Sequence, residues 1–394
     1  MFETLTPPPQ DRIIDIMGLY AADARPEKVD LGVGVYRTEG GRTPVMAAVK
    51  AAEARILQAQ ESKGYVALAG DAGFHAAMRG LILGDAVTPE RVAACATPGG
   101  TGAIRQVLEM VQRLTPQARI WVPSPSWPNH AAIIGHLGLT QVDYRYYDVD
   151  AGGVDRDGML ADLAGAKRGD IVLLHGCCHN PTGADLAAPD WVDLADVFAA
   201  TGAIPFVDIA YQGFGDGLDE DAAGLRSLAA RVPEMLIAAS CSKNFGLYRE
   251  RVGIVLAVTD LGQARAAAAA MLAHLNRQSY AFPPDHGARV VETILTDAEL
   301  TAQWRAELDA MRTRMTANRR TLAEALRAET GSDRFGFVAA QRGMFSLLPV
   351  TEAQVAQLRE DHAIYLVSDG RMNVAGLTAE TIPRVARAIA QVLA

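Results

Sequence analysis

The sequence predicts an α/β protein, with a large domain built on a mostly parallel β-sheet flanked by helices and a smaller α+β domain. Between residues 92 and 258, short apolar runs alternate with helical stretches, which is the pattern of repeated βαβ units. The runs are apolar at almost every position, as expected for parallel strands buried on both faces. At 394 residues the chain also exceeds the size that one hydrophobic core usually supports. We therefore expect two domains.

Six apolar runs are expected to form strands of the large domain. They span residues 92–97, 119–122, 171–175, 204–208, 235–240 and 252–258. Polar motifs follow several of these runs directly. Because ligands of open α/β sheets bind outside the carboxyl ends of the strands, a binding site is predicted at that edge.

The other segments supply flanking helices and the smaller domain. Helices are expected at 11–22 (after the proline run 7–9), 43–60, 264–273 and 379–393, and short strands at 31–36, 335–338, 344–348 and 364–367. A long helix that joins the domains is predicted by the apolar stripe Leu300, Trp304, Leu308, Met311 and Met315. We expect the large domain at 36–310, and the small domain at 1–35 and 311–394, beginning with an N-terminal arm.

Composition excludes several classes of function. The net charge is −9 and no long basic block occurs, which argues against nucleic acid or an anionic membrane surface as partner. No apolar run is long enough to span a membrane, and the first 12 residues lack the apolar core of a signal peptide. The four cysteines show neither a disulfide framework nor zinc-site spacing, because Cys177 and Cys178 are adjacent. We expect a cytoplasmic protein without a metal site.

The segment 240–253 is an unusual loop. Lys243 follows a buried run, is flanked by Ser240 and Ser242, and precedes Arg251. A partly desolvated lysine near other cations has a lowered pKa, as a Schiff-base lysine requires, and the two hydroxyls and the guanidinium are donors suited to a phosphate. A solvated Lys/Arg loop is the alternative, and local composition does not choose between them.

Five further motifs, in order along the chain, decide in favour of the first interpretation. They lie at 99–102 (GGTG), 125–130 (PSWPNH), 178–183 (CHNPTG), 208–214 (DIAYQGF) and 370–376 (GRMNVAG). With the lysine segment they resemble the class I aminotransferases that use pyridoxal phosphate (PLP), in the aspartate and aromatic branch. The resemblance covers nearly the whole chain. It implies the type I PLP-dependent transferase fold with a seven-stranded sheet, and a homodimer with shared active sites and an arm that reaches across it.

The resemblance assigns roles around the cofactor ring. Asp208 would pair with the pyridine nitrogen, although an Asp after a strand also commonly caps a helix. Tyr211 and Asn180 would donate hydrogen bonds to the phenolic oxygen, and the Asn-Pro-Thr-Gly stretch is equally a turn signal. Trp127 would stack on the ring, whereas a lone Trp is otherwise most often core. His130 and His175 would stand behind the ring nitrogen or be core histidines.

A second group would hold the phosphate. Gly100 and Thr101 begin a helix, whose N-terminus favours an anion, and Ser240, Ser242 and Arg251 would complete the cradle. The glycine turn lacks the G-x-G-x-x-G spacing of a dinucleotide site. The resemblance alone adds Tyr65, which would reach the phosphate of the neighbouring subunit.

Substrate-binding residues complete the set. Arg371 would grip the α-carboxylate bidentately, which lysine cannot do. By resemblance, Gly34 lines the substrate entrance, and Arg277 of the other subunit binds the distal carboxylate of dicarboxylic substrates. The sequence departs from aspartate-preferring relatives at Phe282, where they carry a small polar residue.

The expected activity is a ping-pong transfer of an amino group from tyrosine, phenylalanine, tryptophan or aspartate to 2-oxoglutarate. Lys243 would hold PLP and then move the proton from the substrate Cα. Residues 171–185, 204–215, 240–251 and 276–280 are more similar to bacterial aromatic aminotransferases. An aspartate aminotransferase with dicarboxylate preference is the alternative. A PLP-dependent β-lyase or decarboxylase, and a PLP-binding regulator, are the other classes considered.

Overall fold

The computed structural model describes residues 2–6, 12–260 and 262–393. The chain forms two compact units. The smaller unit comprises Met1–Thr43, Arg314–Ala340 and Met344–Ala394, and the larger comprises Pro44–Thr313 and Gln341–Gly343. The proline run 7–9 lies outside the described residues, and the functional limits of the two domains stay a prediction.

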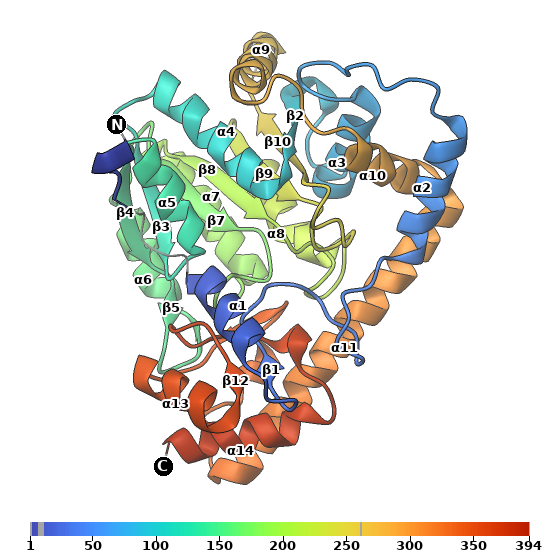
Figure 1. The fold of residues 1–394 in the computed structure, drawn as a ribbon. Helices are drawn as coiled ribbons and strands as arrows, with labels where there is room; N and C mark the ends of the chain where they lie inside the picture. Colours follow the sequence, from blue (N-terminus) through green and yellow to red (C-terminus); the bar gives the residue numbers. More distant parts are fainter. Residues whose placement is uncertain (1, 7–11, 261, 394) are drawn as a thin grey trace. The chain divides into compact units, whose positions relative to one another are not determined.

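Within the described residues, the larger unit is built on a seven-stranded sheet in the order β2-β10-β9-β8-β7-β3-β4 (Figure 1). Strands β4, β3, β7, β8 and β9 are parallel, and β10 runs antiparallel between β9 and β2. The bounds are β2 (Val92–Pro98), β3 (Arg119–Ser124), β4 (Thr140–Arg145), β7 (Ile171–His175), β8 (Ile204–Ile209), β9 (Met235–Ser240) and β10 (Val252–Val258). The predicted mostly parallel, seven-stranded sheet is confirmed.

Strand β4 was not among the predicted apolar runs. It lies at the edge of the sheet, and of its six residues Tyr144 alone is buried. A strand with one buried position carries no apolar run in the sequence. Strand β4 was therefore not predicted because it is exposed.

Helices cover the sheet of the larger unit. Figure 1 shows α4 (Gly99–Leu114) and α5 (Pro128–His136) in front of the strands, and one continuous core joins these helices and α9 (Gly262–Ser279) to the sheet. The other helices of this unit are α2 (Ala47–Ala59), α3 (Ala72–Leu83), α6 (Arg156–Leu163), α7 (Ala188–Thr201), α8 (Glu220–Ala229) and α10 (His286–Thr296). A short hairpin pairs β5 (Tyr147–Asp148) with β6 (Gly153–Val154).

The predicted helices are present, but α2 begins later than expected. The alanine-rich stretch is helix α9, and the apolar stripe of α11 (Ala298–Thr330) is buried as predicted. Helix α2 begins at Ala47, four residues after the predicted start at residue 43, and its N-cap Met46 makes no side-chain cap. Glu307 instead accepts hydrogen bonds from the N–H groups of Ala47 and Ala48, so a distant side chain caps the helix.

The smaller unit holds short strands and helices around its own core. Strand β1 (Val29–Asp30) pairs with β12 (Ile364–Tyr365), and β11 (Phe345–Leu347) pairs with β13 (Arg371–Asn373). Its helices are α1 (Arg12–Ala22), the last part of α11, α12 (Phe337–Ala340), α13 (Glu352–His362) and α14 (Thr381–Leu393).

Two strand predictions in this unit are wrong. Residues 335–338 enter helix α12, because a short apolar run does not distinguish a helix from a strand. Residues 31–36 form no strand, and the carbonyls of Val33 and Val35 accept hydrogen bonds from the side chain of Asn373 rather than from a neighbouring strand.

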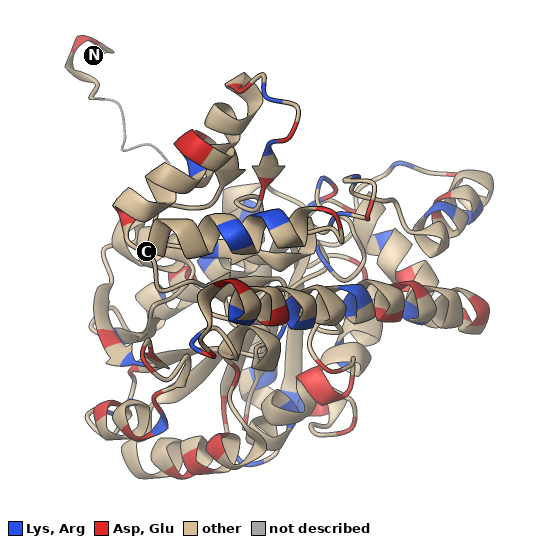
Figure 2. Cartoon of the chain, turned by 90° about the horizontal axis from the view of Figure 1, so that it is seen from below, with Lys and Arg blue, Asp and Glu red and all other residues tan. Residues whose placement is uncertain are grey.

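Charged residues of both signs are interspersed along the elements (Figure 2). Among the described helices, none combines the length and apolar character needed to cross a bilayer.

Candidate active site

Lys243 lies in the turn between β9 and β10. It is half-buried, and its Nζ is 4.9 Å from the centre of the Tyr211 ring. The pKa of Lys243 is lowered to about 8, because burial and the charge of Arg251, which lower it, together outweigh the charge of Asp208, which raises it. A sizeable fraction of this amine is therefore neutral near pH 8, which makes it a competent nucleophile and base.

Asp208 lies near the end of β8, opposite His175 of β7 and Ala238 of β9. It is buried, and its Oδ2 accepts a hydrogen bond of 3.0 Å from Nε2 of His130. Burial alone would raise the pKa of Asp208, but this hydrogen bond and nearby positive charge outweigh burial and lower it. The group is thus a buried carboxylate, suited to pair with a protonated ring nitrogen.

A hydrogen-bonded series stands behind Asp208. Ser126 Oγ lies 2.9 Å from Nδ1 of His130 and 3.0 Å from Nε2 of His175. Burial lowers the pKa of His175 to about 3, so that ring is neutral. Nε2 of His130 thus lies against the Asp208 carboxylate and Nδ1 against the Ser126 hydroxyl. Ser126 therefore links His175 to the histidine that holds Asp208.

The N-terminus of α4 and the lysine turn approach each other closely. A Cβ on Gly100 would lie 3.0 Å from Cβ of Ser240, and one on Gly99 would lie 2.5 Å from the guanidinium of Arg251. The absence of side chains at 99 and 100 therefore permits this approach.

The same region collects donors for an anion. Arg251 donates to the hydroxyl of Ser242 at 3.3 Å, and Ser242 donates its N–H to Ser240 Oγ at 3.2 Å. Thr101 is half-buried in the first turn of α4. A helix N-terminus, hydroxyls and a guanidinium in one place fit a phosphate group. The side chains present thus fit PLP: a nucleophilic amine, a carboxylate and a phosphate cradle.

Other predicted residues lie at the carboxyl ends of neighbouring strands. Tyr211 follows β8, buried Asn180 lies in the loop after β7, and Trp127 lies between β3 and α5. The Trp127 ring is perpendicular to the His130 ring, with centres 5.2 Å apart.

Tyr65 and Arg277 lie together on the surface of the larger unit. The Tyr65 side chain is 86% exposed and stacks on Phe282, with ring centres 4.5 Å apart, and the Arg277 guanidinium lies 5.9 Å from the Phe282 centre. The contacts that the structure gives these two side chains are thus with Phe282.

Arg371 and Gly34 belong to the smaller unit. Arg371 is buried on β13, donates to the carbonyl of Gly32 at 3.1 Å, and has its guanidinium 4.6 Å from the centre of the Phe345 ring. A Cβ on Gly34 would lie 3.0 Å from Cζ of the same ring. Phe345 therefore contacts both predicted substrate residues of this unit.

Sequence reasoning missed Ser126, Phe345 and Asp221. The carboxylate of Asp221, in the first turn of α8, accepts backbone N–H groups of the segment after Tyr211, namely Gly213, Gly215, Asp216 and Gly217. Cys177 and Cys178 lie close to it, but its oxygens already serve these amides. The glycine-rich stretch just before an acidic helix start is the signal that could have indicated Asp221.

Comparison with known proteins places the chain in a family. Residues 26–389 match the family described as aminotransferase class I and II. The chain belongs to this family.

The relatives of this aminotransferase are close over its full length. It is 53% identical to the aromatic-amino-acid aminotransferase of Paracoccus denitrificans over 392 residues, covering 100% of both chains. It is 41% identical to the aspartate aminotransferase of Escherichia coli, again with 100% of both covered. A solved structure of the aromatic-amino-acid aminotransferase of Burkholderia pseudomallei, covalently bound to pyridoxal phosphate, is 42% identical with a TM-score of 0.96 and 100% coverage of both. The predicted enzyme class, cofactor and fold are confirmed: the chain is a PLP-dependent aminotransferase.

The lowered pKa of Lys243 predicts a pH-dependent stability difference in the cofactor-free protein. Below pH 8 the amine is charged in both folded and unfolded states, so folding must desolvate a charge. Above the ordinary value of 10.5 it is neutral in both states and this cost vanishes. At pH 7, Lys243→Met should therefore be more stable than the wild type by about 1–3 kcal/mol, and the gain should disappear between pH 8 and 10.5. Urea denaturation at each pH measures it.

The exposed Lys50→Met is the matched control and should show no such trend. A Lys243→Met difference that does not change with pH would contradict the lowered pKa.

The hydrogen bonds of Asp221 predict a large loss of stability in Asp221→Ala. Removing the carboxylate leaves buried N–H groups of residues 213–217 without their acceptor, which should cost about 3–5 kcal/mol. Asp219→Ala removes an exposed ion pair with Arg226 and should cost less than about 1 kcal/mol. Equal unfolding midpoints for the two variants would refute this role of Asp221.

Proposed function

We propose that this enzyme is an aromatic-amino-acid aminotransferase that moves the amino group of tyrosine, phenylalanine, tryptophan and aspartate to 2-oxoglutarate by a ping-pong route. The observation that carries the proposal is the half-buried amine of Lys243, with its lowered pKa, in a site that also holds the carboxylate of Asp208 and a phosphate cradle. The aromatic preference is supported by the 53% identity with an enzyme of that name.

Each residue has a defined task in this proposal. PLP, when bound, supplies the electron sink for charge that develops at the substrate Cα. Nζ of Lys243 would hold the cofactor. Once the substrate amine has displaced it, Nζ would take the proton from the substrate Cα as a base and deliver it to the cofactor as an acid. Asp208, kept ionised by His130, holds the proton on the ring nitrogen.

The remaining contacts orient the cofactor. The phosphate-holding residues are Gly100, Thr101, Ser240, Ser242 and Arg251. Tyr211 and Asn180 donate to the phenolic oxygen, and Trp127 stacks on the ring. These groups fix the plane of the ring, so that the bond to be broken at Cα can align with it.

Substrate binding in this proposal uses both subunits of a cytoplasmic homodimer. Arg371 binds the α-carboxylate, and Asn180, Trp127 and Gly34 border the substrate. Arg277 and Tyr65 serve the site of the second subunit, which accords with their exposure on the surface of one chain. The N-terminal arm reaches across the dimer, and residues 36–310 form the PLP-binding domain.

Steady-state kinetics separate this proposal from its alternative. The 41% identity with an aspartate aminotransferase favours a dicarboxylate-preferring enzyme as second candidate. We expect glutamate to form from 2-oxoglutarate with phenylalanine and with aspartate, at kcat/KM values within about 100-fold of each other, which is about 2.7 kcal/mol. A thousandfold preference for aspartate would establish the alternative. An amino acid consumed without glutamate formed would indicate a lyase or decarboxylase.

Phe282 is predicted to weaken the use of Arg277 for dicarboxylates. The ring holds the guanidinium by a cation–π contact, which at exposed sites amounts to about 0.5–1 kcal/mol. In Phe282→Asn, kcat/KM for aspartate should rise about 2–5-fold relative to phenylalanine. Phe282→Tyr keeps the ring and is the control that should match the wild type. If kcat/KM for aspartate relative to phenylalanine is unchanged in Phe282→Asn, Phe282 does not weaken the use of Arg277.

A further inference from the structure

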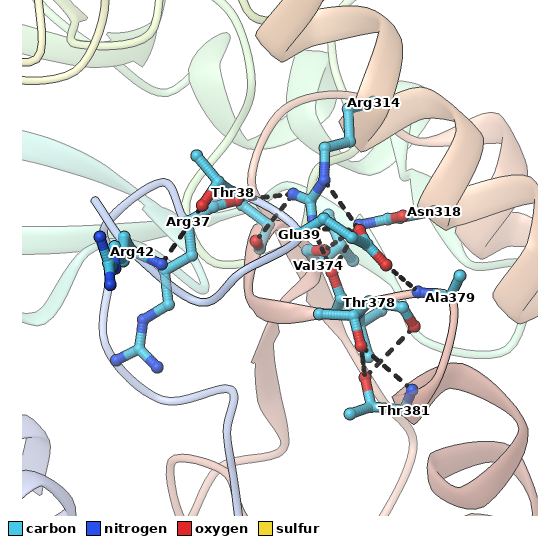
Figure 3. Close-up of polar contacts among 12 residues, drawn as sticks. Arg37, Thr38, Glu39, Arg42, Arg314, Asn318, Val374, Thr378, Ala379 and Thr381 are labelled. Atoms are coloured by element: carbon cyan, nitrogen blue, oxygen red, sulfur yellow. Dashed lines mark hydrogen bonds and ion pairs between the residues drawn. The ribbon is translucent and has the colours of Figure 1, made fainter. Parts of the chain in front are cut away.

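Two segments of the smaller unit lie side by side, residues 30–39 and residues 371–379. The first includes Gly34 and has no strand from 31 to 36, and the second begins with Arg371 on β13. Figure 3 shows Arg314 of helix α11 reaching toward both segments, and Asn318 of the same helix lying near Val374 of the second. We call Arg314, Glu39 and the backbone groups that they bind the Arg314–Glu39 clasp.

The guanidinium of Arg314 binds both segments at once. It donates to the carbonyl of Arg37 at 2.6 Å in the first segment, and to the carbonyls of Leu377 at 2.6 Å and Ala375 at 3.3 Å in the second. It also pairs with Oε2 of Glu39 at 3.0 Å. The Arg314 side chain is 18% exposed and its bonds to the three carbonyls are partly buried, whereas its ion pair with Glu39 faces solvent.

Glu39 completes the clasp with its second oxygen. Oε1 accepts the N–H of Ala379 at 2.6 Å. This hydrogen bond and the nearby Arg314 lower the pKa of Glu39. Glu39 thus links residue 39 of the first segment to residue 379 of the second.

The opposite end of the first segment is fastened by β13. Asn373 donates to the carbonyls of Val33 at 2.6 Å and Val35 at 2.9 Å, and Arg371 donates to that of Gly32 at 3.1 Å. Residues 32–35 are therefore held by side chains of β13, and residues 37–39 by Arg314 of α11. Between them, Gly34 lies against Phe345, the ring that also faces the Arg371 guanidinium.

Removal of Arg314 would take contacts mainly from the first segment. Asn318 also binds the carbonyls of Val374 and Leu377, at 3.1 and 3.0 Å, so the second segment keeps an anchor on α11. In the first segment, residues 37–39 would lose the hydrogen bond at Arg37 and the ion pair at Glu39. Residues 37–39 would keep the ion pair of Arg37 with Asp30 and the hydrogen bond from Ala379 to Glu39, so the first segment would be loosened more than the second.

We propose that Arg314 and Glu39 are positioning residues for carboxylate binding by Arg371. The clasp holds residues 30–39 against residues 371–379. This contact fixes the Gly32 carbonyl and the Phe345 ring around the Arg371 guanidinium. A bidentate grip on a carboxylate requires a fixed guanidinium plane, and a loosened plane weakens it. The inference rests on the role of Arg371 in the proposed function.

The test measures binding of a carboxylate that cannot react. For the PLP-loaded enzyme, the dissociation constant of 3-phenylpropionate should rise about tenfold in Arg314→Met. KM for phenylalanine and for aspartate should rise by a similar factor, since both carry an α-carboxylate, while kcat stays within about threefold. Hydrogen exchange of residues 31–39 should be faster in the variant.

Matched variants separate positioning from general destabilisation. Arg387→Met breaks an exposed ion pair with Glu329 in the same unit and should change neither binding nor exchange. Glu39→Gln keeps an acceptor for Ala379 but loses the ion pair, so its effect should be smaller than that of Arg314→Met. If Arg314→Met does not fold, Glu39→Gln and Arg314→Lys decide the question.

Two results would overturn the inference. One is binding of 3-phenylpropionate within twofold of the wild type in all folded clasp variants. The other is a loss of kcat with KM and binding unchanged, which would place the effect elsewhere. Amino-group transfer by the wild-type enzyme is measured first. Its absence would refute the proposed function rather than this inference.

Discussion

The site depends on an electrostatic balance between an amine and a carboxylate in one partly desolvated region. Burial disfavours the charge of Lys243, and Arg251 adds to this effect, whereas Asp208 favours that charge. If the carboxylate dominated, the amine would stay protonated and could not act as a nucleophile. The hydrogen bond from His130 to Oδ2 stabilises the Asp208 carboxylate independently of the lysine. The balance leaves both groups in the protonation states that transamination needs.

The parallel sheet brings these groups together from distant parts of the sequence. The register of β7, β8 and β9 places His175 opposite Asp208 and Asp208 opposite Ala238, two residues before Ser240. Each strand is buried on both faces, so a slip in register would expose apolar side chains as well as misplace the site. The hydrophobic core and the chemistry are thus specified by the same pairing.

The sequence predicted the sheet from apolar runs that are buried on both faces, and the enzyme class from several motifs in one order. Lys243 and Asp208 became candidates through that order, since each alone has an alternative explanation. Sequence reasoning failed where a residue acts through distant partners. Ser126 matters because it bridges two histidines, and Asp221 because it serves amides of a loop, and neither fact is visible in local composition. The irregular path of residues 31–36 likewise depends on Asn373, far along the chain.

The antiparallel strand β10 has a consequence for assembly of the site during folding. The lysine turn is a hairpin between consecutive strands, β9 and β10, and needs only local pairing. The helix α4 that begins the phosphate cradle follows β2, whose partner β10 lies far away in sequence. The complete anion pocket therefore requires the non-local β2–β10 pair, and a ligand that occupies this pocket stabilises only molecules in which that pair has formed. Cofactor retention in this enzyme is accordingly a report on the most distant strand pairing of its seven-stranded sheet.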